Sequence, residues 1–390
     1  MITDERYARL EAIPGVGAAG VAALRHTTVA VLGLGNIGGQ LAHHLVLHGI
    51  GVVLVDRDVV ADVNLGTQGF LERDLGQSKA EARAERLAPL NPTCRIDPVQ
   101  ADIRQLGLGA LCGVSLIFSC LDSRRSRVVV NEMAMRLGIP WIDGALDGSG
   151  ASLFGRVAAY DFRRHESACY LCPHDSSSLR DISNEGIVEG CSAIWWKDEA
   201  DAAAPTLASS ALGGAVASMQ AIWGVRVLRG QNDESASTEM YFDVGRRHMS
   251  SHRLRRNPRC LLDHQSWPLT PLGSDPAGTT VAQTFAFAEA RVGGEIVLQL
   301  PQRSIVTAAR CPQCGAEVRP YRVLDSLAIG EVHCVCGHEM HPATNELLDR
   351  FGRLEAKPFL DRTWREIGLP PADVVIAANG TRELHILLPE

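Results

Sequence analysis

The sequence predicts an α/β protein, in which a doubly wound and mainly parallel sheet precedes a smaller, β-rich, zinc-binding C-terminal domain. Over about the first 150 residues, short apolar runs alternate with helical stretches, an order that places parallel strands between covering helices. A glycine-rich turn joins the first apolar run to the first helix. After about His264 the chain becomes rich in Pro, Val and Thr, with short alternating runs and paired cysteines, which indicates a second domain.

The elements of the first domain follow from the apolar runs and their boundaries. Asn91-Pro92 stops an Ala-, Glu- and Arg-rich helix, and a polar loop is expected over residues 176–197. In the second domain, the runs EIVLQL and ELHILL predict strands. The expected strands of the first domain are residues 28–33, 51–56, 114–120, 140–143 and 150–162, and its expected helices are residues 37–48, 78–90 and 124–137.

Three regions are expected: an N-terminal helical arm over residues 1–27, a nucleotide-binding domain over residues 28–264, and a C-terminal domain over residues 265–390. The segment from Thr206 to Val225 carries no charge and is long enough to cross a bilayer. Its Ala, Ser and Gly residues make it only mildly apolar. A helix packed closely inside the protein is therefore favoured over a membrane span.

Composition limits the classes of partner. The 390 residues carry a formal net charge of -7 and an isoelectric point near 6.0. This argues against nucleic acid or an anionic membrane as the main partner, because such surfaces attract clustered cations. The start, MITDE, has neither the basic nor the apolar region of a secretory signal, so a cytoplasmic location is expected.

The glycine turn VAVLGLGNIGG and the strand after it predict a nucleotide site. Gly33, Gly35 and Gly38 stand in G-x-G-x-x-G order between strand and helix, where backbone amides can bind phosphate oxygens. Asp56 ends the next strand, where a carboxylate can accept hydrogen bonds from ribose hydroxyls or, alternatively, cap a turn. NAD, FAD and ATP sites share this pattern, so it does not choose among them.

The residues after Asp56 narrow the choice. The segment DRDVVADVNLGTQGFLERDLGQSKAEA, with SCLDS at 119–123, CYLC at 169–172 and RYARL near the start, resembles the ubiquitin-activating-enzyme-like adenylyltransferases of the ThiF/MoeB/HesA superfamily. The resemblance covers about residues 5–264. It implies a Rossmann-like adenylation domain with a crossover loop about 176–205, ATP and Mg²⁺ as ligands, and a homodimer with shared ATP sites.

The resemblance also implies a role for each polar residue of these motifs. Asp58 and Asn64 would line the ribose and phosphate side, and Asp122 would hold Mg²⁺, which prefers oxygen ligands. Lys79 would neutralise charge developing on the α-phosphate, and Arg9 would add a positive charge in the partner's site. The structural alternatives are a solvated lysine at a helix start and, for Asp122, an N-cap of the helix at 124–137.

One position departs from the family pattern. In NLGTQ, Thr67 stands where the family commonly has an arginine, and a hydroxyl cannot clamp a triphosphate as a guanidinium can. Either Arg57, Arg73 or Arg124 compensates for this loss, or ATP binds weakly.

Two groups of cysteines predict zinc. Eleven cysteines in a cytosolic chain favour metal binding or catalysis over disulfides. The pair Cys169 and Cys172 matches the family's first zinc knuckle. Its second half is expected at RNPRCLLDH, where Cys260 is joined by Asp263 or by His264, the better donor.

The second group of cysteines has a spacing that indicates a zinc ribbon. Cys311-x2-Cys314 is followed by Cys334-x-Cys336, and a histidine at 333, 338 or 341 could replace one thiol. This ribbon lies outside the resemblance, which suggests a docking or dimerising domain.

Cys191, in GIVEGCSAIWW, lies where the crossover loop of the family carries a cysteine that can accept an activated acyl group. A nucleophilic thiol needs a setting that lowers its pKa, and the sequence identifies no such setting clearly. A structural loop cysteine remains the alternative.

These features predict an ATP-dependent adenylyltransferase that activates the C-terminal carboxylate of a small ubiquitin-like protein or peptide. The acyl group would then pass to Cys191 and on to a conjugating enzyme. Sulfur-carrier activation and ribosomal-peptide modification are alternatives within the superfamily. A non-catalytic zinc-binding scaffold and an NAD-dependent oxidoreductase are alternatives of other classes, and the set Asn64, Lys79 and Asp122 counts against the oxidoreductase.

Overall fold

The computed structural model describes residues 5–147, 153–175, 177–178, 209–231, 237–273, 278–327 and 332–389, which form two compact units. The described part of the first unit contains the chain up to Arg104 and the chain between Gly113 and Ser266. The second unit contains Gln105–Cys112 and the chain from Trp267 onward. Cys191 and nearly all of the expected loop at 176–205 lie outside the described residues.

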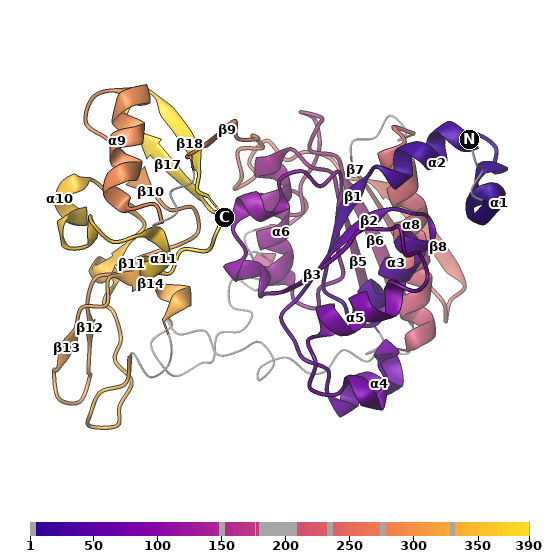
Figure 1. Cartoon of the computed structure of the whole chain (residues 1–390), viewed down its shortest axis with the longest axis horizontal. Helices are drawn as coiled ribbons and strands as arrows, with labels where there is room; N and C mark the ends of the chain where they lie inside the picture. The colour runs from indigo at the N-terminus through magenta and orange to yellow at the C-terminus, as the bar shows by residue number, and fades with distance from the viewer. Residues whose placement is uncertain are drawn as a thin grey trace. The chain divides into compact units, whose positions relative to one another are not determined.

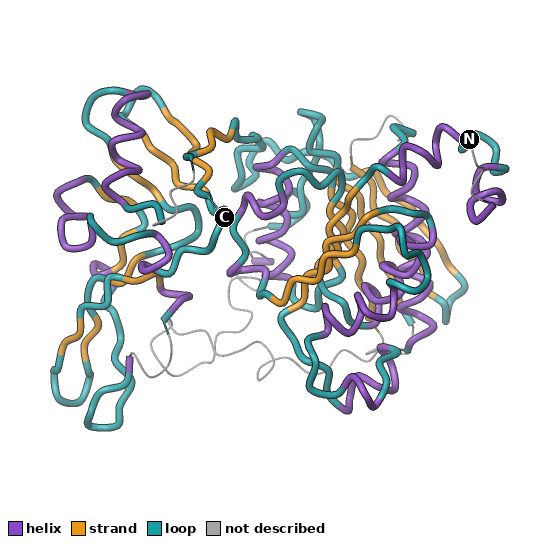
Figure 2. The backbone as a smooth tube through the Cα atoms, in the orientation of Figure 1, coloured by secondary structure: helices purple, strands orange, loops and turns teal. Residues whose placement is uncertain are grey.

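Eight strands build the sheet of the first unit: β1 (Thr28–Leu32), β2 (Gly51–Asp56), β3 (Ile96–Gln100), β4 (Ile117–Ser119), β5 (Trp141–Asp147), β6 (Phe154–Tyr160), β7 (Ser237–Asp243) and β8 (His248–Arg253). Their order is β3-β2-β1-β4-β5-β6-β7-β8. Strands β1 to β5 pair in parallel, and β6 to β8 are added in antiparallel pairs. The predicted doubly wound, mainly parallel sheet is confirmed (Figure 2).

Helices cover both faces of this sheet (Figure 1). One face carries α3 (Asn36–Leu47), α5 (Lys79–Leu87) and α8 (Ser210–Leu228), and the other carries α6 (Arg124–Leu137). For α3, α5 and α6 this division follows from right-handed crossovers, because the chain moves outward from β1 to β3 on one side and from β4 to β5 on the other. A short α4 (Asp62–Gln68) lies between β2 and α5 in sequence.

The long helix α8 packs on the sheet. Its Gln220 is fully buried, and its Nε2 donates to the carbonyl oxygens of Ser119 at 3.1 Å and Ile142 at 3.3 Å. At Gly224 an added Cβ would come within 2.3 Å of the Phe118 ring. Within the described chain, α8 is the one helix whose length and mean hydropathy of 1.3 would suit a membrane span. The contacts of Gln220 and Gly224 fit the predicted packed helix.

The N-terminal arm is docked through its first turn. It comprises a 3₁₀ turn (Glu5–Tyr7), α1 (Ala8–Glu11) and α2 (Gly17–Arg25). Tyr7 is buried, and its hydroxyl accepts a hydrogen bond from Asn91 Nδ2 at 2.7 Å. Arg6 Nη1 donates to Asn91 Oδ1 at 2.7 Å. Asn91, which stops helix α5 in the sequence, therefore also anchors the arm.

The second unit contains a five-stranded sheet with the order β16-β10-β17-β18-β9 and the helices α9, α10 and α11. Residues 105–112 belong to this unit: the Gly109 amide donates to the Ala372 carbonyl at 2.7 Å, and the Leu108 amide to Asp373 Oδ1 at 3.2 Å. The bounds are β9 (Leu269–Pro271), α9 (Val281–Val292), β10 (Val297–Gln299), β11 (Ile305–Val306), β12 (Ala309–Arg310), β13 (Glu317–Val318), β14 (Arg322–Val323), β15 (Leu347–Leu348), β16 (Arg350–Phe351), α10 (Arg353–Ala356), α11 (Trp364–Ile367), β17 (Val374–Ala378) and β18 (Glu383–Leu387).

Candidate functional site

The glycine turn between β1 and α3 is fixed by close backbone contacts. Gly33 has a φ of +86°, which an L side chain rarely adopts. A Cβ on Gly38 would lie 1.8 Å from the Gly33 carbonyl oxygen, so no side chain fits there. Gly35 is the N-cap of α3, and no side chain caps that end of the helix. The first amides of α3 are thus available to an anion.

Asp56 is held rigidly at the end of β2. Its Oδ2 accepts the Leu34 amide of the glycine turn at 2.6 Å, and its Oδ1 accepts the Asp58 amide at 2.9 Å. Burial raises the pKa of Asp56, and these two amides oppose that shift. Each carboxylate oxygen keeps a second lone pair, which is the arrangement needed to bind ribose hydroxyls.

Lys79 is brought to Asp58 by backbone pairing. Val59 and Ser78 form an isolated antiparallel bridge, and the Lys79 amide donates to the Asp58 carbonyl at 3.0 Å. The Lys79 Nζ then lies 2.8 Å from Asp58 Oδ2. Only 7% of the Lys79 side chain is exposed, against 52% for Asp58. Lys79 is therefore a buried cation, and the alternative of a solvated helix-start lysine is wrong.

A cavity of about 620 Å³ lies at the carboxyl ends of these strands. It collects most of the residues that the motifs predict for the nucleotide site, although they are spread over almost ninety positions of the chain. Asn64 also has a structural task, because its Oδ1 accepts the Ala61 amide at 2.9 Å in the first turn of α4. The predicted residues that line the cavity are Gly33, Gly35, Asp56, Asp58, Asn64, Lys79 and Asp122.

Two of the described residues that the motifs predict, Gly38 and Arg9, are not among those that line this cavity. Gly38 does not line the cavity, but it packs against the Gly33 carbonyl and so allows the glycine turn to form. Arg9 is exposed on α1. Cys191 lies outside the described residues.

Asp122 is exposed at the cavity wall, between β4 and α6. The alternative that it caps α6 is wrong, because the N-cap is Ser123, whose hydroxyl accepts the Ser126 amide at 3.0 Å. Ser123 takes this task since its side chain is the one directly before the first helical residue. The Asp122 carboxylate therefore remains available to a ligand in the cavity.

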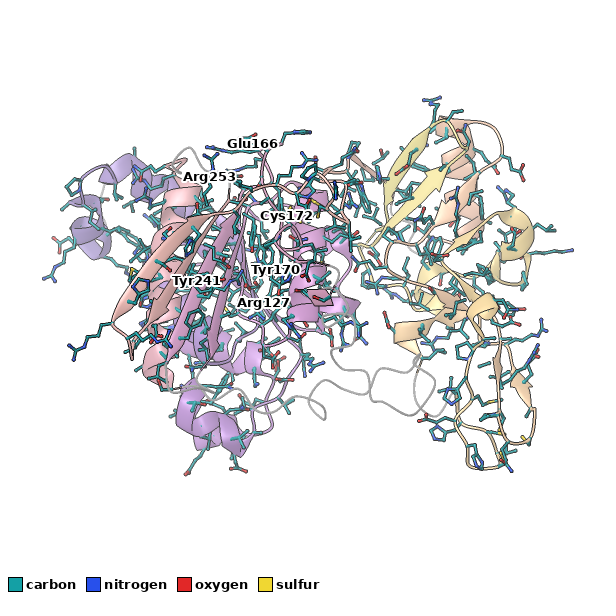
Figure 3. All side chains as sticks on the ribbon, turned by 180° about the vertical axis from the view of Figure 1, so that it is seen from behind. Arg127, Glu166, Tyr170, Cys172, Tyr241 and Arg253 are labelled. Carbon is teal, nitrogen blue, oxygen red and sulfur yellow. The ribbon has the colours of Figure 1, made fainter. Side chains whose placement is uncertain are left out.

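Arg127 is a cavity residue that the sequence analysis missed. Its Nε donates to the buried carboxylate of Asp143 on β5 at 3.0 Å, and its Nη2 donates to the Leu121 carbonyl beside Asp122. Asp143 also accepts Arg156 Nη1 at 2.6 Å. Burial raises the pKa of Tyr170 and the charge of Arg127 opposes that shift; Figure 3 labels both residues. Arg127 thus ties the Asp122 loop to the sheet, and its position five residues after Asp122 was the available signal.

Of the arginines considered as replacements for the family arginine, only Arg57 lines the cavity together with Thr67. Arg73 is 76% exposed and lies beside Asp74, and neither it nor Arg124 is among the cavity residues.

The charges of the cavity favour a divalent cation alongside a triphosphate. Among the residues that the structure describes, four carboxylates line it, against three cations. Several anionic groups beside polyphosphate need additional positive charge, and oxygen ligands suit Mg²⁺. The four are Asp56, Asp58, Asp102 and Asp122, and the three are Arg57, Lys79 and Arg127.

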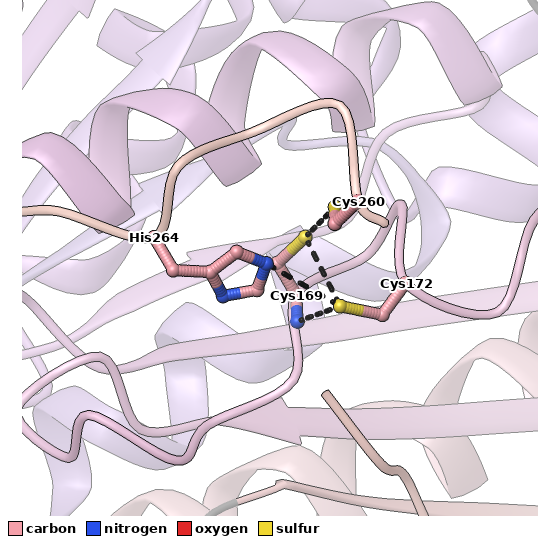
Figure 4. A group of neighbouring side chains, drawn as sticks. All are labelled: Cys169, Cys172, Cys260 and His264. Carbon is pink, nitrogen blue, oxygen red and sulfur yellow. Dashed lines mark hydrogen bonds between the residues drawn. The ribbon is translucent and has the colours of Figure 1, made fainter. Parts of the chain in front are cut away.

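Cys169, Cys172, Cys260 and His264 form a compact group in the first unit (Figure 4). Sulfur atoms of Cys169 and Cys260 lie 3.6 Å apart, and His264 Nε2 lies 3.4 Å from the sulfur of Cys172. The other ring nitrogen of His264 faces the Ser167 carbonyl at 3.2 Å, which fixes the ring orientation. Three thiols and one imidazole are a donor set that suits tetrahedral zinc.

Asp263, the other candidate for the fourth position, is engaged elsewhere. Its carboxylate pairs with Arg136 and accepts the Gln265 amide at 3.0 Å. His264 therefore faces the thiols, and Asp263 holds the loop against α6.

Cys311, Cys314, Cys334 and Cys336 form a second compact group in the second unit. Cys311 and Cys336 sulfurs are 3.5 Å apart, and those of Cys314 and Cys334 are 3.4 Å apart. The paired strands β12 and β13 flank the first two cysteines. Both cysteine turns end in a glycine with positive φ, Gly315 and Gly337. Four thiols on two tight turns fit the predicted zinc ribbon.

Comparison with known proteins decides among the nucleotide-binding classes. The family model described as the ThiF family matches residues 7–262. The chain belongs to the ThiF family. Because this match spans the glycine turn, Lys79, Asp122 and the three cysteines of the first group, the oxidoreductase interpretation is excluded.

Two similar curated proteins are adenylyltransferases. A molybdopterin-synthase adenylyltransferase of Salmonella typhimurium is 28% identical over 258 residues, which are 65% of this chain and 94% of the relative. A sulfur carrier protein adenylyltransferase of Thermus thermophilus is 28% identical over 267 residues, 66% of this chain and 89% of the relative. The chain is accordingly an ATP-dependent adenylyltransferase of the ThiF family.

A solved structure agrees on the fold. Escherichia coli MccB with succinimide superposes with a TM-score of 0.52 at 17% identity, covering 66% of this chain and 73% of MccB.

Proposed function

We propose that this ThiF-family enzyme adenylates the C-terminal carboxylate of a small ubiquitin-like protein, with a sulfur carrier protein or a ribosomal peptide as the alternative substrates. The observation that carries the proposal is the buried Lys79 ammonium beside Asp58, in a cavity that the glycine turn also lines. A desolvated cation at this place can stabilise charge that develops on a phosphate.

The reaction needs no covalent chemistry from the cavity residues. A carboxylate oxygen attacks the α-phosphorus of ATP, the bond from that phosphorus to the bridging oxygen of the β-phosphate breaks, and pyrophosphate leaves with the electron pair. The products are the acyl-adenylate and pyrophosphate. Lys79 would exchange Asp58 for the α-phosphate oxygens, and the amides at the start of α3 would bind the phosphates.

Mg²⁺ would offset the charge of the phosphates and of the leaving pyrophosphate. Asp122 fits this ligand, since its carboxylate is exposed at the cavity wall and Arg127 fixes the loop that carries it.

Arg9 would act in the cavity of a second protomer. Its exposure on a docked arm, away from the cavity of its own chain, supports a homodimer with shared sites. The anchor at Tyr7 and Asn91 would limit the motion of the arm.

In a second step, the Cys191 thiolate would attack the acyl carbon of the acyl-adenylate. The bond from that carbon to the AMP oxygen would break, releasing AMP and leaving a thioester for transfer to a conjugating enzyme.

Pyrophosphate exchange with ATP tests the proposed reaction. The substrates are a ubiquitin-like protein ending in glycine, a sulfur carrier protein and short peptides, each paired with its C-terminal amide as a matched control. Exchange that requires the free carboxylate supports the proposal and ranks the substrates. Release of ADP without any exchange would contradict it.

A further inference from the structure

We propose that Arg57 forms the base-binding wall of the nucleotide cavity and that Asp102 is its positioning residue. The inference rests on the proposed function, because it takes ATP as the nucleotide. It gives a task to two charged residues at the ends of β2 and β3 that line the cavity and that the proposed chemistry does not use.

The strand order sets the direction in which the nucleotide lies. β1 leads into the glycine turn, β2 ends at Asp56, and β3 is the next strand along the sheet. Asp56 contacts both neighbours: its Oδ2 accepts the Leu34 amide at 2.6 Å, and its backbone carbonyl accepts the Ala101 amide at 3.2 Å. With phosphates at the turn and ribose at Asp56, the base lies beyond the end of β3, beside residues 101–103.

Asp102 is fully committed to two arginines. Its Oδ1 accepts the Arg104 amide at 2.9 Å and Nε at 3.0 Å, and its Oδ2 accepts Arg104 Nη2 at 2.6 Å and Arg57 Nη1 at 3.0 Å. Burial opposes ionisation, yet these bonds outweigh it and lower the pKa of Asp102 to about 2. Four donors use the lone pairs of one carboxylate, so Asp102 holds Arg57 and does not itself bind the base.

Arg57 is held by its edge. Nη1 is fixed by Asp102, and Nε lies 3.6 Å from Asp58 Oδ1. The side chain is 32% exposed and lines the cavity together with Ala101 and the buried Ile103. A planar guanidinium with a carboxylate at each of two edges offers its face to an aromatic ring.

This arrangement has a consequence for the position of Thr67. If Arg57 contacts the base, it does not bind the phosphates in place of the family arginine whose position Thr67 occupies. Phosphate binding then depends on Lys79, the amides of the glycine turn, Mg²⁺ and Arg9 of the neighbouring protomer.

The test compares three ligands by equilibrium binding to the full chain: adenosine, ATP and pyrophosphate. Arg57→Ala is expected to weaken the binding of adenosine and of ATP by the same factor, about tenfold. The affinity for pyrophosphate should not change. Arg57→Lys, which keeps the charge without the plane, should behave like Arg57→Ala. Arg95→Ala is the matched control, since it removes an arginine paired with Asp97 at 2.6 Å on the same unit but outside the cavity.

Asp102→Asn separates positioning from contact. Alone, Asp102→Asn should weaken adenosine binding less than Arg57→Ala does. The double variant should bind adenosine no more weakly than Arg57→Ala, because both substitutions act on the same interaction. Additive losses would overturn the role of Asp102.

Two outcomes overturn the base wall. One is a variant Arg57→Ala that loses affinity for ATP and pyrophosphate but not for adenosine, which would make Arg57 a phosphate contact. The other is unchanged binding of all three ligands at an unchanged melting temperature. A wild-type protein that binds adenosine but exchanges pyrophosphate with no carboxylate would contradict the proposed function and not this inference.

Discussion

The ammonium of Lys79 lies 2.8 Å from the carboxylate of Asp58, and both side chains line the nucleotide cavity. The pair is asymmetric, because Lys79 is buried while half of Asp58 is exposed. An exposed carboxylate can be exchanged for a phosphate oxygen at little cost, whereas a buried ammonium needs an anion at all times. In the proposed reaction, the pair would keep a cation ready where negative charge develops on the phosphate.

Lys79→Ala should lower the rate of pyrophosphate exchange by about 100-fold, because it removes the cation that stabilises the transition state. The double variant Lys79→Ala/Asp58→Asn also removes the carboxylate that Lys79→Ala leaves unpaired. Its rate of pyrophosphate exchange should still not recover. Arg95→Ala, outside the cavity, should leave exchange unchanged. A double variant with wild-type exchange would show that Lys79 only neutralises Asp58.

Mixing two inactive variants tests the shared site. Arg9→Ala and Lys79→Ala proteins that exchange subunits form heterodimers in which one site lacks both cations and the other is intact. We expect a clear return of activity on mixing. If native mass spectrometry shows heterodimers and activity stays absent, Arg9 does not act in the neighbouring site.

His264 and Asp263 are adjacent, and only His264 faces the thiols. Protein purified without chelator should contain about two zinc ions per chain, one for each cysteine group. His264→Ala should lose about one of them on dialysis against a chelator, and Asp263→Ala should keep both. The reverse pattern would make the carboxylate the fourth ligand. Less than about one zinc per chain in the wild type would contradict both sites.

Adenylation and thioester formation should separate by mutation, because they use different groups. Cys191→Ala is expected to keep pyrophosphate exchange and to lose a reductant-sensitive adduct between enzyme and substrate. An adduct that persists in Cys191→Ala would identify another thiol as the acceptor. A wild type that never forms one with its active substrate would end the chemistry at the adenylate.

The nucleotide cavity was predictable because its residues follow strand ends. In a parallel sheet all carboxyl ends meet at one edge, so Gly33, Asp56 and Asp122 converge whatever the loops between them do. Lys79 was predictable from its motif but not from general rules, since its burial depends on the bridge between Val59 and Ser78.

Other features depend on tertiary contacts that local patterns do not encode. β3 carries Pro98, which argues against a strand, and it is tolerated because β3 is the edge of the sheet. From the sequence, residues 105–112 were expected in the nucleotide-binding domain. Their hydrogen-bond partners, Ala372 and Asp373, lie more than 250 positions away in the chain. Helix α9 was missed although Thr280 and Gln283 form a readable capping box.

The most direct test of the central claim is the intact mass of the substrate protein after incubation with ATP and Mg²⁺. The account predicts that its C-terminus gains one AMP with a Cys191→Ala enzyme, in which no thioester consumes the adenylate, and that this gain is strongly reduced when Lys79→Ala is added and absent when the tail is amidated. A substrate that gains AMP equally with Lys79→Ala, or that gains a phosphate in place of AMP, would contradict the proposed chemistry of this cavity.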